Sequence, residues 1–252
     1  MDTFSITSVR ELTGAATAVF ETTQTRWWFR GQKDHRWDLL PKIRRGYTRQ
    51  QEKLLTNLFY TRARTRHATC PTDDDYGGWL ALMQHFGLPT RLLDWSNSPL
   101  IAAYFAVKYP FDIGVTGELT DAAVWVLEPH RLNESQGYEP VFPPLNAKSV
   151  EEMIRPAMKG QDSSQIKVLA ASPLEIDLRM FVQQGQFTVH VADEPLNQVN
   201  GCEKWLKKMR IPSQAISSMA RDLDVLGIRL ADVFPDLQNL ATEITNMHRP
   251  SQ

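Results

Sequence analysis

The chain has 252 residues, of which 42% are hydrophobic and 23% charged, and its formal net charge is −1. This composition is typical of a globular chain with a substantial core, and its near-neutral balance gives no overall field that would attract nucleic acid or an anionic membrane. Cys70 and Cys202 lie far apart without CxxC partners, which indicates a reducing compartment and no zinc site. No apolar run approaches the roughly 20 residues that span a bilayer, and no signal-peptide pattern opens the chain. We therefore expect a cytoplasmic protein with no membrane partner.

The first predicted elements are a helix and an aromatic strand. Ser8 and Glu11 have capping-box spacing, which predicts a helix over 9–22 with Leu12, Ala16, Val19 and Phe20 on its inner side. A strand over 26–32 follows and ends in Arg30-Gly31-Gln32. Gly31 allows a close backbone approach. Arg30 is expensive to bury unless it is paired or faces a cleft, so an anion-binding role and a buried ion pair both stay open.

A basic stretch follows. It contains Lys42, Arg44, Arg45, Arg49, Lys53, Arg62, Arg64 and Arg66 against the single acid Glu52. We predict a long helix over 47–66 with Leu54, Leu58 and Ala63 inward, whose charges either bind phosphates or are paired elsewhere in the fold. The acidic run 73–75 fits the start of the next helix better than a metal site, so we predict no metal.

The stretch 84–99 concentrates polar groups that can act on a ligand. It contains His85, Arg91, Asp94, Ser96 and Ser98 among apolar neighbours. We predict a turn, a short buried strand and then a helix capped by Ser98 with Pro99 at its first position. Polar groups at a strand end beside a helix N-terminus suit an anionic ligand. Arg91 and Asp94 alternatively form a structural ion pair, and His85 alternatively is a structural histidine.

The rest of the chain adds strands and then helices. A continuous apolar run predicts a buried strand over 122–127, and further strands are expected near Ile166 and Phe187. Two helices end the chain and cover the core as a lid. Their predicted inward residues are Ile216, Met219, Leu223 and Leu226, and then Leu237, Leu240 and Ile244. We predict one domain, 1–252, with a core over about 27–240 and helices 9–22 and 213–246 packed on it. The expected fold class is α+β, with short, mixed, mostly antiparallel strands near Trp27, Thr90, Val124, Ile166 and Phe187.

Several motifs together resemble the FRG-domain family. They are Phe29-Arg30-Gly31 with Gln32, the run from His85 to Ser96, Ala103-Tyr104-Phe105-Ala106, Gln184-Gly185-Gln186-Phe187, and a tail from Leu226 to Leu237. The resemblance extends from about Trp27 to Leu240. The order of elements in turn resembles the ADP-ribosyltransferase fold, in which three strand-borne motifs surround nicotinamide adenine dinucleotide (NAD).

The resemblance implies that NAD is a substrate and assigns roles to individual residues. Arg30 would hold the phosphates or a ribose, and Ser96 would position the nicotinamide ribose. Trp95, Tyr104 or Phe105 would supply a stacking face for nicotinamide. The implied binding set is Phe29, Arg30, Gly31, Gln32, Thr90, Arg91, Trp95, Ser96, Tyr104 and Gln186. The implied catalytic set is Arg30, His85, Asp94 and Gln184.

The third motif departs from the ADP-ribosyltransferase pattern, because it has Gln183, Gln184 and Gln186 where a glutamate is expected. A carboxylate there stabilises the positive charge that develops on the ribose. Asp94, Glu175 or Asp177 are candidates to replace it. Alternatively, an amide binds the ribose while His85 or Asp94 activates the acceptor.

Three functional hypotheses follow. The first is an ADP-ribosyltransferase-like toxin or phage-defence effector that modifies a protein, RNA or DNA and has an antitoxin or chaperone partner. The second is a nucleic-acid hydrolase that uses His85, Arg91 and Asp94, with the basic helix on the phosphates. The third is a non-catalytic nucleotide-binding or interaction module, which the absent glutamate favours.

Overall fold

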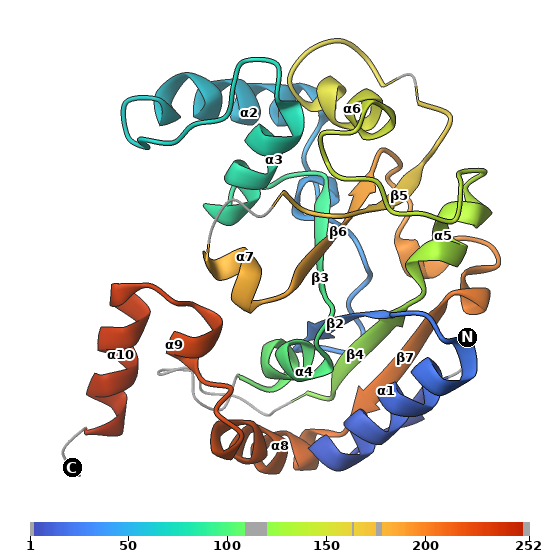
Figure 1. Cartoon of the computed structure of the whole chain (residues 1–252), viewed down its shortest axis with the longest axis vertical. Coiled ribbons are helices and arrows are strands. Elements are labelled where there is room, and N and C mark those ends of the chain that lie inside the picture. Colours follow the sequence, from blue (N-terminus) through green and yellow to red (C-terminus); the bar gives the residue numbers. More distant parts are fainter. Residues whose placement is uncertain (1–2, 109–119, 163, 175–177, 249–252) are drawn as a thin grey trace.

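The computed structural model describes residues 3–108, 120–162, 164–174 and 178–248. These residues form an α+β fold around a seven-stranded sheet in the order β1-β7-β4-β2-β3-β6-β5 (Figure 1). The β1–β7 pair is parallel and the other pairs are antiparallel. The strands are β1 (Thr3–Ser5), β2 (Trp28–Gln32), β3 (Leu92–Ser96), β4 (Ala122–Leu127), β5 (Val168–Ala171), β6 (Gly185–His190) and β7 (Leu206–Ile211). The predicted fold class is confirmed.

Helices surround this sheet, and several begin at predicted caps. They are α1 (Val9–Thr23), α2 (Arg49–Ala63), α3 (Tyr76–His85), α4 (Pro99–Val107), α5 (Pro129–Ser135), α6 (Lys148–Ile154), α7 (Leu178–Val182), α8 (Ser213–Val225), α9 (Leu230–Val233) and α10 (Leu237–Met247). Ser98 caps α4 by accepting from the backbone N–H of Ile101, with Pro99 in the first turn, as predicted. Asp75 caps α3, so the acidic run does open a helix.

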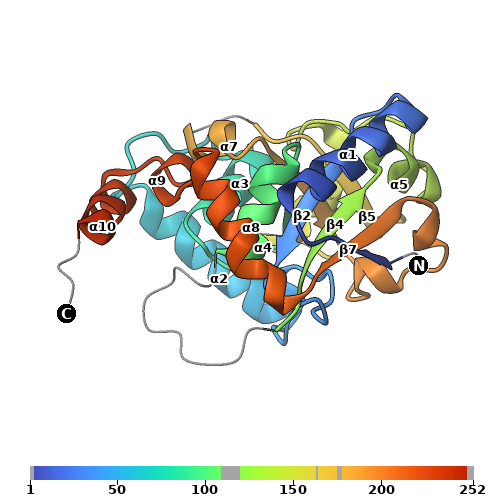
Figure 2. The same cartoon turned by 90° about the horizontal axis from the view of Figure 1, so that it is seen from below.

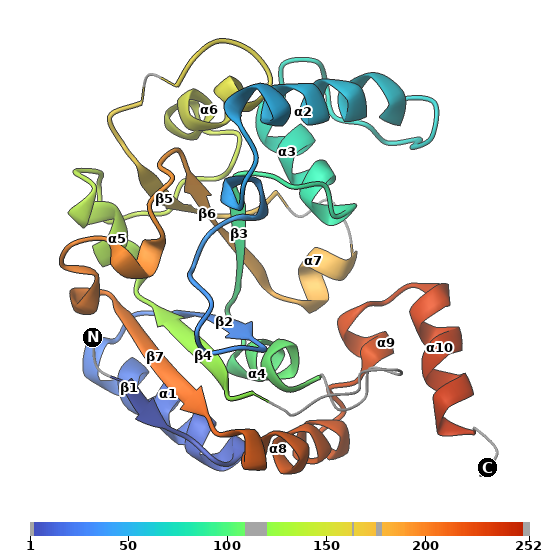
Figure 3. The ribbon, with the colours of Figure 1, turned by 180° about the vertical axis from the view of Figure 1, so that it is seen from behind.

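The core has three apolar clusters separated by the sheet. One joins α1, α4 and α8 to β2, β4 and β7, and a second joins α3 and α6 to β3, β5 and β6. The third lies on the opposite face and contains Trp28, Trp95, Trp125 and Trp205. Figures 1 and 3 show α1, α4 and α8 grouped at one end of the sheet and α2, α3 and α6 grouped at the other, and Figure 2 views the molecule from the end of α1 and α8. The two helical groups therefore leave a boundary between β2 and β3.

The inward face of α2 differs from the prediction. Leu54 and Leu58 are exposed, whereas Glu52 and Thr56 are buried together with the correctly predicted Ala63. The cause is a buried ion-pair network that draws the Glu52 side of the helix to the core. The leucine spacing was thus a misleading guide to orientation.

The C-terminal helices fit the prediction only in part. Ile216, Met219 and Leu223 of α8 are buried, but Leu226 is exposed. Helix α10 has no buried residue, and Leu237 is 83% exposed, so the predicted inward face of this helix is wrong. Helix α10 stands beyond α9 at the periphery and does not cover the core (Figures 1 and 3). Strands β1 and β7 were not predicted, because their short or lysine-rich sequences lack a recognisable strand pattern.

None of the described helices combines the length and the apolar character needed to cross a membrane.

Candidate functional site

Strands β2 and β3 are paired at one position and then separate. Phe29 pairs with Ser96, whereas β2 is paired along its whole length with β4, and β3 with β6. A cavity of about 1100 Å³ lies at this opening. Its lining includes Leu92 and Leu93, which are neighbours on β3 and point to opposite faces of the sheet. The cavity therefore extends into the gap between the strands.

Helix α4 forms one wall of the cavity, and Gly31 allows its position. A Cβ at Gly31 would clash with the carbonyl oxygen of Ala102 and lie 2.7 Å from the backbone nitrogen of Ala106. The close backbone approach predicted for Gly31 therefore exists, and α4 is the partner. A glycine here lets α4 pack directly on β2 and bring Phe105 to the cavity.

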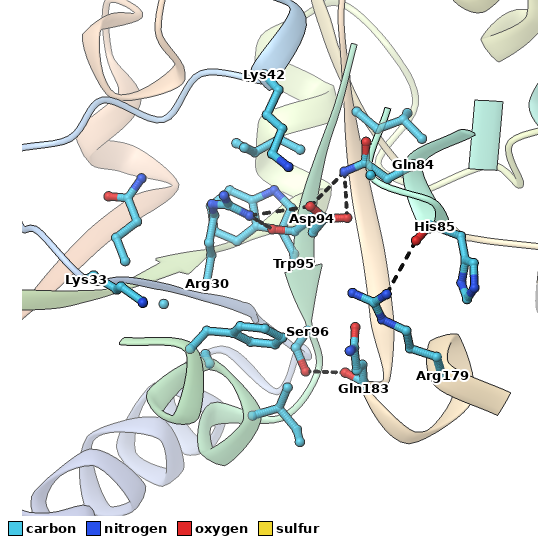
Figure 4. A pocket seen from close by; sticks show the side chains of 18 of the residues that line it. Arg30, Lys33, Lys42, Gln84, His85, Asp94, Trp95, Ser96, Arg179 and Gln183 are labelled. Carbon is cyan, nitrogen blue, oxygen red and sulfur yellow. Dashed lines mark hydrogen bonds and ion pairs between the residues drawn. The ribbon is translucent and has the colours of Figure 1, made fainter. Parts of the chain in front are cut away.

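Arg30 lies in the gap between the two strands. Its Nη1 donates to the carbonyl oxygen of Asp94 at 2.6 Å and lies 3.9 Å from Asp94 Oδ2 (Figure 4). Burial lowers the pKa of Arg30 from its usual value, the charge of Asp94 opposes this, and the charge of Arg45 adds to it. The side chain is 19% exposed, and its buried Nε has no hydrogen-bond partner among the described residues. Arg30 is thus a cation on the cavity wall whose hydrogen-bonding capacity is only partly used.

Asp94 is held in the cavity by a glutamine. Gln84 Nε2 donates to Asp94 Oδ1 at 2.9 Å and to Oδ2 at 2.8 Å, and Gln84 Oε1 accepts from Thr90 Oγ1 at 2.6 Å (Figure 4). The hydroxyl of Thr90 therefore fixes which way the Gln84 amide is turned. The Asp94 side chain is 56% exposed, so its carboxylate stays accessible while its orientation is set. Thr90 itself is buried and acts through Gln84 and not by lining the cavity.

The third predicted segment reaches the site through the turn before β6. Ser96 Oγ donates to the carbonyl oxygen of Gln183 at 2.7 Å and accepts from the backbone N–H of Ser98 at 3.0 Å. The N–H of Asn97 donates to the carbonyl oxygen of Gln184 at 3.0 Å. Ser96 and Gln183 both line the cavity (Figure 4). Segments near residues 30, 95 and 183 therefore meet at one place.

Two glutamines of the predicted set lie outside the described cavity lining. Gln184 has a left-handed backbone with φ 48, and its neighbour Gln183 lines the cavity in its place. Gln186 lies opposite Trp95 on β6, and its Oε1 is buried without a hydrogen-bond partner in the described chain. The left-handed residue lies in the turn between α7 and β6, directly after the cavity-lining Gln183. Sequence spacing alone gave no sign of it.

Arg91 is taken up by a buried ion-pair network. Its Nε and Nη2 donate to the two oxygens of Glu52 at 2.8 and 2.9 Å, and its Nη1 donates to Asp162 at 2.9 Å. Arg44 donates to the same Glu52 at 3.0 Å. Arg91 is fully buried and does not line the cavity, so the ligand-binding role that the resemblance implied for it is wrong. The predicted ion pair with Asp94 is also wrong, because Arg91 pairs with Glu52 and Asp162.

The aromatic residues of the prediction divide between the cavity and the core. Phe29 and Trp95 line the cavity, whereas Tyr104 packs beside the α1–α8 cluster and lines a smaller, separate cavity. Phe105, the neighbour of Tyr104, faces the main cavity and contacts Phe234 edge-on at 5.8 Å.

A buried histidine that the sequence did not single out lies behind Trp95. Trp95 Nε1 donates to Thr188 Oγ1 at 3.0 Å, and that hydroxyl lies 2.8 Å from His190 Nε2. Burial, helped by the positive charge of Arg30, lowers the pKa of His190 to about 3. His190 is therefore neutral near pH 7, and its Nε2 accepts the Thr188 proton. This relay fixes the indole of Trp95 at the cavity wall.

Positive charge dominates the described lining. The cations are Arg30, Lys33, Lys42, Arg45, Lys108 and Arg179, and the carboxylates are Asp94 and Asp236. Arg179 Nη1 donates to the carbonyl oxygen of His85 at 3.4 Å, which joins α7 to the end of α3. His85 and Gln32 also line the cavity. This surplus of cations, next to aromatic rings, is suited to an anionic ligand with flat groups.

Three of the eight cations in the basic stretch, Arg44, Arg49 and Arg64, form ion pairs with described residues. Arg49 forms ion pairs with Asp162 and Asp193, and Arg64 pairs with Asp73. Lys42 and Arg45, at its start, are the members that reach the cavity. No group of three or more potential metal ligands occurs among the described residues. Glu175 and Asp177, named as carboxylate candidates, lie outside the described residues.

Comparisons with known proteins give one family. Searches of curated proteins and of solved structures found no match. The matching family model is the FRG domain, over residues 25–113, a span that contains β2, β3, α4 and the cavity wall between them. Over these residues the chain is similar to the FRG domain.

Proposed function

We propose that this chain is an ADP-ribosyltransferase-like enzyme that uses NAD to modify a macromolecule, either a nucleic acid or a protein. The observation that carries the proposal is the meeting of three remote segments, at Arg30, Asp94–Ser96 and Gln183, in one cation-rich cavity. A dinucleotide has two phosphates and two flat rings, and the cavity offers guanidinium groups and aromatic side chains to each.

The residues present fit such a substrate. Arg30 faces the cavity from β2, where a guanidinium fork binds phosphate or ribose oxygens. Phe105 is partly exposed and is placed by the close packing of α4 on Gly31, so it offers a ring for stacking. Trp95 is 3% exposed and held by Thr188, so it forms a rigid part of the cavity wall. The Ser96 hydroxyl is committed to the turn at Gln183 and Ser98, so its role is to shape the ribose-side wall.

Asp94 supplies a negative charge beside Arg30 in the cavity. When bound, NAD supplies a glycosidic bond whose electron pair leaves with nicotinamide, so positive charge develops on the ribose. The Asp94 carboxylate, oriented by Gln84, stabilises that charge, as the glutamate of the usual third motif would. A nucleophile of the acceptor forms the new bond to the ribose carbon, and its proton goes to His85 or Asp94 at the cavity edge.

The direct test is transfer of label from radiolabelled NAD to the macromolecules of a cell lysate. We expect transfer by the wild type and a loss of about 100-fold or more in Arg30→Ala and Asp94→Asn, since each removes one charged group from the site. Arg62→Ala is the matched control, because Arg62 is an exposed arginine on α2 outside the described lining. Absence of both NAD consumption and label transfer by the folded wild type would contradict the proposal.

The proposal extends to a toxin or phage-defence effector acting in the cytoplasm and restrained by an antitoxin or chaperone. Expression of the wild type in a bacterial host should stop growth, and Arg30→Ala should restore it at equal protein level. Equal growth arrest by both proteins would show that the toxicity does not depend on Arg30 in this cavity.

One feature favours a non-catalytic nucleotide-binding module as the second candidate. The Gln183 side-chain amide donates to the carbonyl oxygen of Val233 at 2.9 Å, so the third segment presents neither a carboxylate nor an uncommitted amide N–H from this residue. Binding of NAD by the wild type without any turnover in the presence of lysate would select this alternative.

A further inference from the structure

Trp37 differs from the other tryptophans of the chain. It is 48% exposed, whereas Trp27, Trp28, Trp79, Trp95, Trp125 and Trp205 are each at most 5% exposed. Trp37 lies on the connection between β2 and α2 and lines the main cavity. Within the described part of the chain its ring has no aromatic or cationic partner, and its Nε1 has no hydrogen bond. A large flat ring is thus presented to the cavity with an unused hydrogen-bond donor.

Two exposed cations come from the same connection. Lys42 and Arg45 both line the cavity, and Lys42 extends toward Arg30 and Asp94 (Figure 4). Arg45 Nε and Nη2 donate to the carbonyl oxygen of Leu40 at 3.0 and 2.8 Å, which holds the guanidinium in place. Lys42 has no ion-pair partner among the described residues. Arg45 and Lys42 therefore keep charge available for a ligand.

The acids of this connection do not neutralise these cations. Asp34 is paired with Arg36, at 2.7 Å, and Asp38 Oδ1 accepts from Asn197 at 2.9 Å. Neither carboxylate lines the cavity. The connection between β2 and α2 therefore contributes an indole and two cations to the cavity lining, and neither of these two carboxylates.

We propose that Trp37, Lys42 and Arg45 form a subsite for a nucleoside phosphate, with the base stacked on Trp37 and the phosphate bound by Lys42 and Arg45. Base stacking on an exposed aromatic ring beside a cationic groove is a general way of binding nucleotides without sequence preference. The subsite deepens the proposed function and rests on it for the identity of the nucleotide that arrives.

Two sources can supply such a nucleotide. One is the adenylate half of NAD, with the nicotinamide half at Arg30 and Asp94. The other is a nucleotide of a single-stranded nucleic-acid acceptor that enters beside bound NAD. The cavity volume of about 1100 Å³ exceeds the range of roughly 300–1,000 Å³ that is usual for a site holding one small ligand, so both arrangements have room.

Acrylamide quenching of intrinsic fluorescence tests the subsite, because Trp37 is the exposed indole among seven. Adenosine monophosphate and a short single-stranded oligonucleotide are the probes. In the wild type, we expect each probe to reduce acrylamide quenching of the accessible part of the tryptophan fluorescence. In Trp37→Phe, this accessible part of the fluorescence should be absent. Protection by adenosine monophosphate and ADP-ribose, but not by nicotinamide mononucleotide, identifies the adenylate source. Protection by the oligonucleotide after saturation with NAD identifies the acceptor source.

Affinities of variants give a second readout by calorimetry and oligonucleotide anisotropy. Trp37→Ala should weaken binding about 5- to 150-fold, the range for loss of one stacked base, whereas Trp37→Phe should largely retain it. Lys42→Ala should weaken binding and reduce its salt dependence. Lys148→Ala, an exposed lysine on α6 outside the described lining, and Phe20→Ala, an exposed aromatic on α1, should do neither.

The inference is overturned if no probe protects Trp37, if Trp37→Ala binds as tightly as the wild type, or if an acidic peptide protects as well as the oligonucleotide. The last result would indicate a protein acceptor in place of base stacking. If Trp37→Ala leaves both NAD consumption and oligonucleotide binding unchanged, the subsite is refuted while the proposed function is unaffected. Protection of Trp37 by adenosine monophosphate without any NAD binding would refute the proposed function and support the subsite.

Discussion

Replacing Glu52 by glutamine would test whether Arg91 is structural. Glu52 is 1% exposed, and its two carboxylate oxygens accept from Arg91 and Arg44 at distances between 2.8 and 3.0 Å. Glutamine has nearly the same shape but replaces one acceptor by a donor. The variant therefore leaves two buried guanidinium groups with too few acceptors.

The structure limits the expected loss of stability. Breaking a buried ion pair by removing one partner usually costs about 3–5 kcal/mol, because the remaining charge stays buried. Asp162 and the carbonyl oxygen of Met153 still accept from Arg91 Nη1 at 2.9 and 2.5 Å. We therefore expect the lower end of that range, about 3 kcal/mol, which corresponds to a decrease in Tm of roughly 6–12 °C for a chain of this size.

Urea unfolding at pH 7 would measure this loss, with Glu152→Gln on the exposed side of α6 as the control. NAD binding by the folded fraction of Arg91→Lys should match the wild type, because Arg91 lies outside the cavity lining. A decrease below about 1 kcal/mol for Glu52→Gln would refute the network, since that is the scale of an exposed pair. Loss of NAD binding in a fully stable Arg91→Lys variant would show that Arg91 contributes to ligand binding after all.

Three further predictions concern other parts of the molecule. Gly31→Ala should displace α4 and lower both Tm and NAD affinity, because its Cβ meets the backbone of Ala102; unchanged values in thermal unfolding and calorimetry would contradict this close packing. His190 has a folded pKa of about 3, below the unfolded value near 6.5, so it contributes stability that is complete above pH 6.5 and is lost as pH falls toward 3. Between pH 7 and pH 5 its share of the loss is about 2 kcal/mol, and urea unfolding of His190→Asn should show a pH dependence smaller by that amount. Leu240→Ser with Ile244→Ser on α10 should change the free energy of unfolding by less than about 0.5 kcal/mol each, because both side chains are exposed; a larger loss in urea unfolding would mean that this helix packs on the core.

Local motifs predicted the centre of the fold well. The helix capped by Ser98, the fully buried strand at 122–127 and the strand carrying Arg30 all depend on neighbours in sequence. The meeting of the segments near residues 30, 95 and 184 was expected from the family resemblance and not from local patterns. In the structure Phe29 pairs with Ser96, and the turn before β6 bonds to the end of β3.

The remaining features depend on partners that are far apart in sequence. Arg91 and Asp94 are three positions apart, yet Arg91 turns to Glu52 on α2 while Asp94 turns to the cavity. The same buried carboxylate sets the orientation of α2 against the pattern of its leucines. Whether Trp37 is exposed or buried likewise depends on how the connection after β2 folds over the sheet, which no local pattern encodes.

The most direct test of the central claim is calorimetry of NAD binding to the wild type, Arg30→Ala and Arg62→Ala. Arg30 is the guanidinium in the gap between β2 and β3, and Arg62 is an exposed arginine of α2 outside the described lining. We predict one site in the wild type and in Arg62→Ala, and an affinity at least about tenfold lower in Arg30→Ala, as expected for loss of a charge-assisted contact to a phosphate. Equal affinities for the three proteins, or no binding by the folded wild type, would contradict the account.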